Sequence, residues 1–423
     1  MADIITFITD LLIALVDDLL AIDLSEFRAI IIMLLTSLIW FIFVLLSVVM
    51  LIWLERKAMG RFMDRRSTKT GPVPYGLFQN FADFFKLLGK EIIFPNGSDR
   101  LGMIVGLFII VTTGVAAYFV IPFTEHLFVS DPPMGFLVVF AIFSLYPVAV
   151  AIIGWTSNNK FTLLGGFRSA AQLVSYEIPL VLSLAGAVLI VNAAKDTAER
   201  SFSLISIVTF QSENALGFLP FAWFTVLLPI GALIFTITTV AEAERVPFDL
   251  PEGESELIMG WRTELTAIFY MIGMLGEYLH MYMGAALSVM IFFGGWTMPF
   301  PEITGIIPGS IWFTIKVYLI LFLEIWIRGA LPRIRIDQLL DFSWKFLVPM
   351  SIVNLLLAAV IAIGAGDGLD PLWLTVGYIL TLVVLAVVII RYVFMGKPKE
   401  IPETYTTADH KKKPKKSTDG VKA

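Results

Sequence analysis

The sequence predicts an all-α integral membrane protein, a bundle of about nine transmembrane helices. The chain has 423 residues, of which 58% are hydrophobic and 15% are charged, whereas soluble domains have roughly 45–50% apolar and about 25% charged residues. Apolar stretches recur at about the 20-residue length that a helix needs to cross a bilayer. Basic residues gather in alternate connections between these stretches. Lipid is the solvent that accommodates this composition.

The nine stretches divide into an eight-span core over 29–364 and an additional C-terminal span within 365–396. Most of them carry no charged residue, and the exceptions hold Glu177, Glu277, Lys316 and Glu324. The predicted spans are 29–54, 101–122, 134–155, 171–193, 216–241, 265–294, 308–327, 346–364 and 371–390.

The distribution of basic residues predicts the orientation in the cell membrane. Most of the 30 lysines and arginines fall in the segments that share one side with the C-terminus. Cytoplasmic loops carry the excess of Lys and Arg. We therefore expect a multi-pass protein of the plasma membrane with a cytoplasmic C-terminus and the N-terminus on the outer side.

Three further segments are expected outside the spans. Residues 1–28 are apolar with Asp3, Asp10 and Asp17 on one helical face, which predicts an amphipathic helix in the outer interface. A second amphipathic helix is predicted at about 76–91, and it either anchors in lipid or lines a site. The tail 397–423 contains HKKKPKKS at 410–417, which predicts a disordered basic segment attracted to anionic lipid. A nucleic-acid partner is not expected.

Cysteine and histidine usage limits the redox chemistry of the chain. It has no cysteine and only three histidines, without metal-ligand spacing. It cannot hold an iron–sulfur cluster through thiolates, and we expect no metal in this chain. An electron carrier would have to sit on a partner subunit.

The connection 242–264 is the most acidic segment. Only Arg245 and Arg262 oppose its acids, and apolar residues such as Phe248 and Leu250 interrupt it. If the loop packs, its carboxylates cannot all ionise, and it becomes a candidate proton store. A flexible, solvated acidic loop is the alternative. The acids are Glu242, Glu244, Asp249, Glu252, Glu254, Glu256 and Glu264.

Acids inside predicted spans indicate function by default because they cost roughly 2.5–3.5 kcal/mol to insert, and two of the three such acids are interpreted in this way. These are Glu177 and Glu277. For Lys316 and Glu324 we expect pairing with each other or with a neighbouring subunit. For His280 a local hydrogen bond is expected rather than a metal.

Two clusters flank the spans on the cytoplasmic side. The segment ERKAMGRFMDRRSTK at 55–69 is typical of a positive-inside anchor, which leaves Glu55 unexplained. The segment RGALPRIRIDQLLDFSWK at 328–345 predicts an elbow that either binds a partner or neutralises acids of the other loops.

Four sequence blocks carry a resemblance to a known family. LERKAMGR with GLFQNFADFFKLLGKE, GWTSNNKFTLLGGFRSAAQLVSYEIPL, AEAERVPFDLPEGESEL and RGALPRIRIDQLLDFSWK occur in family order over about 29–364. They resemble the quinone-site membrane subunit of respiratory complex I, the NADH:quinone oxidoreductase, a family known as subunit 1 or the H subunit.

The resemblance implies a quinone tunnel near the cytoplasmic surface, with the quinone as substrate and no activity of this chain alone. Peripheral-arm subunits, one bearing the terminal iron–sulfur cluster, would complete the tunnel. Small membrane subunits and antiporter-like subunits would be further partners, and the antiporter-like subunits would translocate protons or sodium. By motif, the proton-coupling residues would be Glu55, Glu177, Glu242, Glu252, Glu254, Glu256, Glu264 and Glu277. The residues of the quinone cavity would be Arg56, Asp83, Lys86, Glu91, Arg245 and Asp249.

The chain departs from the family pattern in places. STKTGPVPYG is one residue longer than usual and lacks an Asn, so no arginine of 61–66 is assigned to the tunnel. Glu244 and Glu324 are unusual acids for their positions. The alternatives are a membrane subunit of an energy-converting hydrogenase, a secondary ion transporter and a structural anchor for a peripheral arm. The electron donor (NADH, ferredoxin or deazaflavin), the quinone type, the ion and the role of the ninth span stay open.

Overall fold

The computed structural model describes residues 28–68, 76–124, 128–194, 201–213, 223–250, 253–298, 308–364 and 371–395. The regular structure of this part is helical. The chain divides into two compact units, Met1–Thr381 and Leu382–Ala423, and the division falls within the last helix. The predicted interfacial helix before residue 28 and the tail 397–423 lie outside the described residues, and the predicted domain limits stay a prediction.

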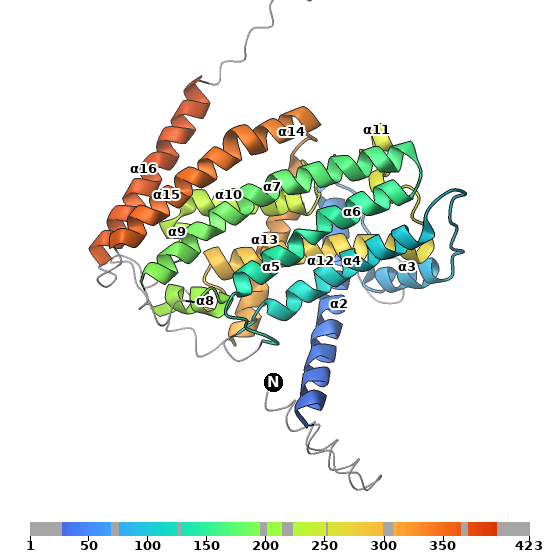
Figure 1. Cartoon of the computed structure of the whole chain (residues 1–423), viewed down its shortest axis with the longest axis horizontal. Coiled ribbons are helices and arrows are strands. Elements are labelled where there is room, and N and C mark those ends of the chain that lie inside the picture. Colours follow the sequence, from blue (N-terminus) through green and yellow to red (C-terminus); the bar gives the residue numbers. More distant parts are fainter. Residues whose placement is uncertain are drawn as a thin grey trace, which may run out of the picture. The chain divides into compact units, whose positions relative to one another are not determined.

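Within the described residues, each of the nine predicted spans corresponds to a helix or a consecutive pair of helices (Figure 1), and residues 216–222 of the fifth span lie outside them. These are α2 (Arg28–Phe62), α4 (Arg100–Val120), α5 (Gly135–Phe143) with α6 (Leu145–Thr156), α7 (Lys160–Ala193), α9 (Phe224–Leu227) with α10 (Pro229–Glu242), α12 (Ala267–Phe292), α13 (Gly309–Ala330), α15 (Val348–Gly364) and α16 (Pro371–Met395). The shorter helices are α3 (Gln79–Leu88), α8 (Leu204–Glu213), α11 (Glu254–Leu257), the 3-10 turn η3 (Gly260–Arg262), α14 (Ile336–Phe342) and the π-helical turn η5 (Ser343–Leu347).

Six helical segments of the described chain are long and apolar enough to cross a membrane. The other three predicted spans differ in character: α10 has only 14 residues, α12 contains Glu277 and His280, and the side chains of α16 are described only over Thr375–Val387. The six segments are Ser37–Phe62, Arg100–Val120, Gly135–Thr156, Lys160–Ala193, Gly309–Ala330 and Ile336–Ile363. The fold class predicted from the sequence, an all-α integral membrane protein, is confirmed.

Large apolar side chains cover the outside of these helices. On α4, Leu101 and Phe108 are 73% and 70% exposed, and Leu319 on α13 and Leu356 on α15 are each 62% exposed. A water-facing helix turns such residues inward. Hydrocarbon chains are as apolar as leucine, so they surround these residues without cost.

Helix α12 lies at the centre of the larger unit, and from Gly276 to Phe292 all its residues are buried. Helix α7 packs along α6, α10 and α15 (Figure 1). The backbones of α6 and α7 approach closely at glycine: a Cβ on Gly154 would lie 3.0 Å from the Cα of Gly166. Small residues permit such approaches between membrane helices.

Two helices run further than the sequence predicted. Helix α2 continues beyond residue 54 to Phe62, so Glu55 and Arg56 stand on its last turns. Helix α7 begins at Lys160 rather than at 171, because the Asn159 side chain accepts a hydrogen bond from the Phe161 N–H and caps its start. Both extensions bring charged segments, which are predicted to be cytoplasmic, into fixed positions against the bundle.

The predicted second amphipathic helix is present as α3. None of its residues is buried. The apolar stripe of Phe78, Phe81, Phe84, Phe85 and Leu88 is exposed. Its position along the cytoplasmic interface stays a prediction.

Candidate functional site

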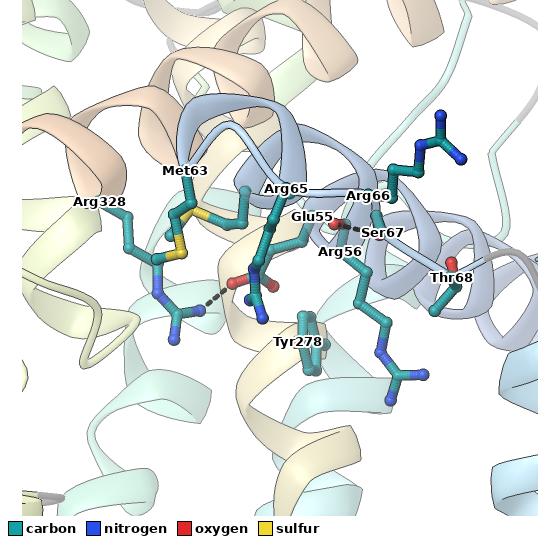
Figure 2. A pocket seen from close by; sticks show the side chains of 11 residues that line it. Glu55, Arg56, Met63, Arg65, Arg66, Ser67, Thr68, Tyr278 and Arg328 are labelled. Carbon is teal, nitrogen blue, oxygen red and sulfur yellow. Dashed lines mark hydrogen bonds and ion pairs between the residues drawn. The ribbon is translucent and has the colours of Figure 1, made fainter.

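A cavity of about 440 Å³ lies at the C-terminal end of α2. Figure 2 shows Arg328 of α13 pointing at Glu55, with Tyr278 of α12 beside them. The α2 extension and the segment after it supply the rest of the wall, so the cavity needs the helix to continue past residue 54. Its lining residues are Glu55, Arg56, Met59, Gly60, Met63, Arg65, Arg66, Ser67, Thr68, Tyr278 and Arg328.

Glu55 is the buried acid of this cavity. Its Oε1 accepts hydrogen bonds from Arg328 and, at 3.1 Å, from Nη1 of Arg245. The Arg245 guanidinium also lies 4.4 Å from the ring centroid of Tyr278, over its face. A cation between a carboxylate and an aromatic face is stabilised by both. The cavity thus contains a buried carboxylate that is paired with two arginines.

The acidic connection between α10 and α12 packs against the bundle. Phe248, Leu250, Leu257 and Trp261 are buried, so the described part of this loop is not the flexible, solvated alternative. Residues 251–252, which include Glu252, lie outside the described residues. The side chain of Glu254 is likewise outside the described part of the structure.

Inside this loop a carboxylate, an indole and an ion pair lie together. Glu244 accepts a hydrogen bond from Nε1 of Trp261 at 3.3 Å. Arg262 donates to the Glu277 carboxylate at 2.9 Å, and both of these side chains are buried. Burial, and then the charge of Glu277, raise the pKa of Glu244 to about 8, although Arg262 acts in the opposite direction. A carboxyl that titrates in this range can take up or release a proton near neutral pH.

A further pair joins the loop to the arginine-rich elbow. Arg333 donates to Asp249 at 3.0 Å. Burial raises the pKa of Asp249, and the charge of Arg333 counteracts part of that rise. Together with Arg328 on Glu55, this pair neutralises acids of other segments, which is one of the two roles predicted for the elbow.

Glu242, the last residue of α10, and Glu177, on α7, extend this group of acids. Oε1 of Glu242 is buried without a hydrogen-bond partner among the described residues, and its charge is repelled by those of Glu177 and Glu244. Gln172 of α7 donates to the Ala241 carbonyl at 2.9 Å and holds the two helices together here. The protonation state of one of these acids therefore affects the proton affinity of the others.

Other predicted site residues lie apart from this cluster. Asp83 pairs with Arg56 at 2.6 Å, and Glu256 pairs with Arg168 at 2.8 Å. Glu264 accepts a hydrogen bond from Asn159 at 2.5 Å. Lys86 and Glu91 are exposed.

Sequence reasoning did not assign Arg262, Tyr278, Trp261, Arg328 and Arg333 to the site. Arg262 carried a signal as one of two basic residues among many acids, and Arg328 and Arg333 belong to the elbow that was predicted to neutralise acids or bind a partner. Trp261 and Tyr278 carried no such signal. The cavity also contains Arg65 and Arg66, from the stretch in which no tunnel arginine was predicted.

The predictions for Lys316, Glu324 and His280 have mixed outcomes. Lys316 and Glu324 do not pair with each other: the Lys316 ammonium donates to the carbonyls of Phe293, Gly295 and Thr297 at 2.6–3.0 Å, beyond the end of α12. Orphan carbonyls there attract a cation more strongly than a carboxylate two turns away can. The local hydrogen bond of His280 is confirmed, from Nδ1 to the Gly276 carbonyl at 2.8 Å. Within the described residues, no group of acids and histidines could hold a metal ion.

The apolar helices enclose paired carboxylates beside a cavity at the end of α2. This arrangement defines the class of the protein: multi-pass membrane proteins with ionisable groups buried inside the helical bundle. The model of the NADH dehydrogenase family matches residues 35–359. The chain belongs to this family, in its subunit 1 branch, also called the H subunit, as the sequence blocks predicted.

Relatives named as the H subunit of NADH-quinone oxidoreductase share about two fifths of their residues with this chain. The one from Geobacillus thermodenitrificans (strain NG80-2) is 41% identical over 307 residues, which cover 73% of this chain and 87% of the relative. Those from Anoxybacillus flavithermus (strain DSM 21510 / WK1) and Bacillus thuringiensis (strain Al Hakam) are each 40% identical over the same shares.

Proposed function

We propose that this chain is the membrane subunit of a complex I-type oxidoreductase that forms the quinone-binding tunnel together with peripheral-arm subunits. It couples quinone reduction to proton or sodium translocation through a chain of glutamates. The names of its relatives support the enzyme class. The single structural observation that supports the coupling is the run of buried charged residues that begins at Glu55 and continues through Arg245 to the loop acids.

The cavity suits the head of a quinone. Guanidinium donors and the Tyr278 hydroxyl stand next to the Met59 and Met63 side chains, and a quinone has an apolar ring with polar oxygens. Electrons would come from a cluster on a partner, since this chain has no cysteine. The subunit would have no activity alone.

Coupling follows from electrostatics. Two electrons reduce a quinone to its dianion, and two protons from neighbouring groups convert the dianion into the neutral quinol. Groups near Glu55 and Arg245 that give up these protons therefore change charge during turnover. In a low-dielectric cluster that change shifts the protonation of neighbouring carboxyls. Glu244, whose pKa is raised to about 8, and Glu242 would pass the change toward Glu277 and Glu177.

The test uses the complete complex in liposomes. Donor-to-quinone turnover and ion pumping are compared between wild type, Glu242→Gln and Asp341→Asn, a control that removes an exposed acid whose ion pair is with Lys345. We expect Glu242→Gln to lose both activities in an assembled complex, while the control keeps them.

Two outcomes contradict the proposal. Unchanged turnover and pumping in Glu242→Gln would make the acidic loop a structural element. A wild-type complex that evolves hydrogen and reduces no quinone would favour the hydrogenase alternative.

A further inference from the structure

Glu324 is a buried acid for which the proposed glutamate chain has no role. It lies on α13 with 2% of its surface exposed. Neither carboxylate oxygen has a hydrogen-bond partner among the described residues. An ionised carboxylate without partners inside a bundle is strongly destabilising, whereas the neutral acid is tolerated. This position therefore favours a carboxyl that holds a proton.

Two arginines related to Glu324 are already engaged with another acid. Arg328 follows Glu324 by one helical turn, and Arg245 attracts it electrostatically. Both arginines donate to Glu55. Glu55 and Glu324 thus have the same two guanidinium groups as possible partners, and in this structure both groups pair with Glu55.

Arg328 is positioned to form an ion pair with either Glu55 or Glu324. A Glu four residues before an Arg on a helix is the favourable order for a side-chain pair. The long Arg side chain can therefore turn back along α13 to Glu324 as well as across to Glu55 on α2. Its own guanidinium is part of the cavity wall, so a molecule or a charge in the cavity can shift its position.

Tyrosines lie on α12 and on α13, the helix that carries Glu324. Tyr282 follows Tyr278 by one turn of α12, and its ring lies 6.4 Å from that of Tyr318 on α13. The Tyr282 hydroxyl is buried without a hydrogen-bond partner among the described residues. Tyr282 also stacks on Tyr118 of α4 at 5.3 Å. Buried phenol groups are thus present on α12, which packs against the helix that carries Glu324.

We propose that Glu324 is a second proton-binding carboxyl coupled to the cavity, and that Arg328 alternates between Glu55 and Glu324. In one state Glu55 is ionised and paired with Arg328, and Glu324 is protonated. In the other, Arg328 pairs with ionised Glu324, and Glu55 carries the proton. One proton and one guanidinium change places and the total charge stays constant. This inference rests on the proposed function, because turnover at the cavity drives the exchange.

The test exploits the unpaired state of the Glu324 carboxyl. Replacing an unpaired buried acid by a residue of similar volume should not harm the fold and can stabilise it. We expect complexes with Glu324→Gln or Glu324→Leu to assemble with wild-type or higher thermal stability. Coupled turnover should nevertheless fall by about ten-fold or more, because a positioned proton-transfer group contributes at least that factor. Glu324→Asp should restore part of it, and Thr314→Val, on the same helix, should leave it unchanged.

Infrared difference spectra of the complex with reduced minus oxidised quinone report the proton directly. We expect a carboxylic-acid carbonyl band that disappears in Glu324→Gln and persists in Thr314→Val. Full turnover in both Glu324→Gln and Glu324→Leu would overturn the inference. Failure of both variants to assemble would overturn it too, since the carboxyl would then be structural.

A parallel Glu55→Gln complex separates the two proposals. If Glu55→Gln loses turnover while the Glu324 variants keep it, the alternating arginine is wrong and the proposed function stands. If Glu55→Gln and Glu242→Gln also keep turnover, the proposed function itself fails.

Discussion

At the scale of single residues, the site is a set of buried charges that depend on one another. Glu55 accepts from two arginines, and Glu277 accepts from Arg262 inside a packed loop. Losing one member of such a set leaves its partner charged and desolvated, which costs more than the pair contributes. Substitutions here therefore separate stability from activity only when both partners are changed.

Breaking the Arg262–Glu277 pair should destabilise the subunit. Arg262→Met leaves the buried Glu277 carboxylate without this cation, and a cost of about 3–5 kcal/mol is expected. Thermal denaturation of the purified complex should show the loss. The double variant Arg262→Met with Glu277→Gln removes both charges and should recover much of the stability. A single variant as stable as the wild type would contradict the structural importance of the pair.

Glu244 should make the stability of the protein decrease as the pH rises. Its folded-state pKa of about 8 lies above the value of 4.5 that is ordinary for a glutamate in water. The folded state therefore holds a proton that the unfolded chain releases, so stability is fully present below the unfolded pKa and is lost as pH rises through the folded value. Between about pH 5 and pH 8 the wild-type melting temperature should fall relative to that of Glu244→Gln. Parallel curves for the two proteins over this range would exclude the shift.

At the scale of elements, the site depends on where helices end and how closely they approach. The extended α2 positions Glu55, and η3 positions Trp261 and Arg262 against α7. That contact is made by glycine on both sides, since a Cβ on Gly165 would lie 2.6 Å from the Cα of Gly260. Gly260 itself has a φ of +57°, where other residues are strained. The position of the Arg262–Glu277 pair thus depends on this close backbone contact as well as on the packing of Trp261.

Gly165→Ala should disturb the site without touching a charged residue. The added methyl group must displace the η3 backbone, and overpacking of this kind costs about 1–3 kcal/mol. We expect lower thermal stability and lower quinone reductase activity in the complex. Gly135→Ala is the matched control, because a Cβ there meets nothing closer than 3.7 Å. Equal behaviour of the two variants would show that η3 can move without consequence.

At the scale of the whole molecule, lipid-facing surface and charge distribution act together. The exposed leucines and phenylalanines of α4, α13 and α15 require a hydrocarbon environment. The segregation of Lys and Arg to one set of connections then selects one of two orientations. Membership of the NADH dehydrogenase family fits this arrangement.

The orientation can be measured by cysteine labelling, because the chain has no cysteine of its own. Ser130→Cys lies in a connection predicted to be outside, and Asn96→Cys in one predicted to be cytoplasmic; both residues are exposed. In intact cells a membrane-impermeant maleimide should label the first variant alone. After permeabilisation both should react. The reverse pattern would invert the predicted topology.

Much of the fold was predictable because its signals are local. Each span is a run of apolar residues, and the amphipathic α3 shows its stripe within three turns. The four sequence blocks identified the family for the same reason. The acids of the site were also visible, since Glu177 and Glu277 interrupt apolar runs and the acidic loop has nearly one sign of charge.

The partners of those acids required the folded chain. Glu55 and Arg328 are separated by 273 positions, and no periodicity links them. The observed end of α2 and the observed start of α7 differ from the predicted ones. Capping and neighbouring helices stabilise additional helical turns that the length of an apolar run does not predict. Lys316 selected backbone carbonyls over Glu324 for a similar reason, since packing brings the end of α12 to it. A single sequence records which groups are costly to bury, whereas long-range packing decides which of them meet a partner and which, like Glu324, do not.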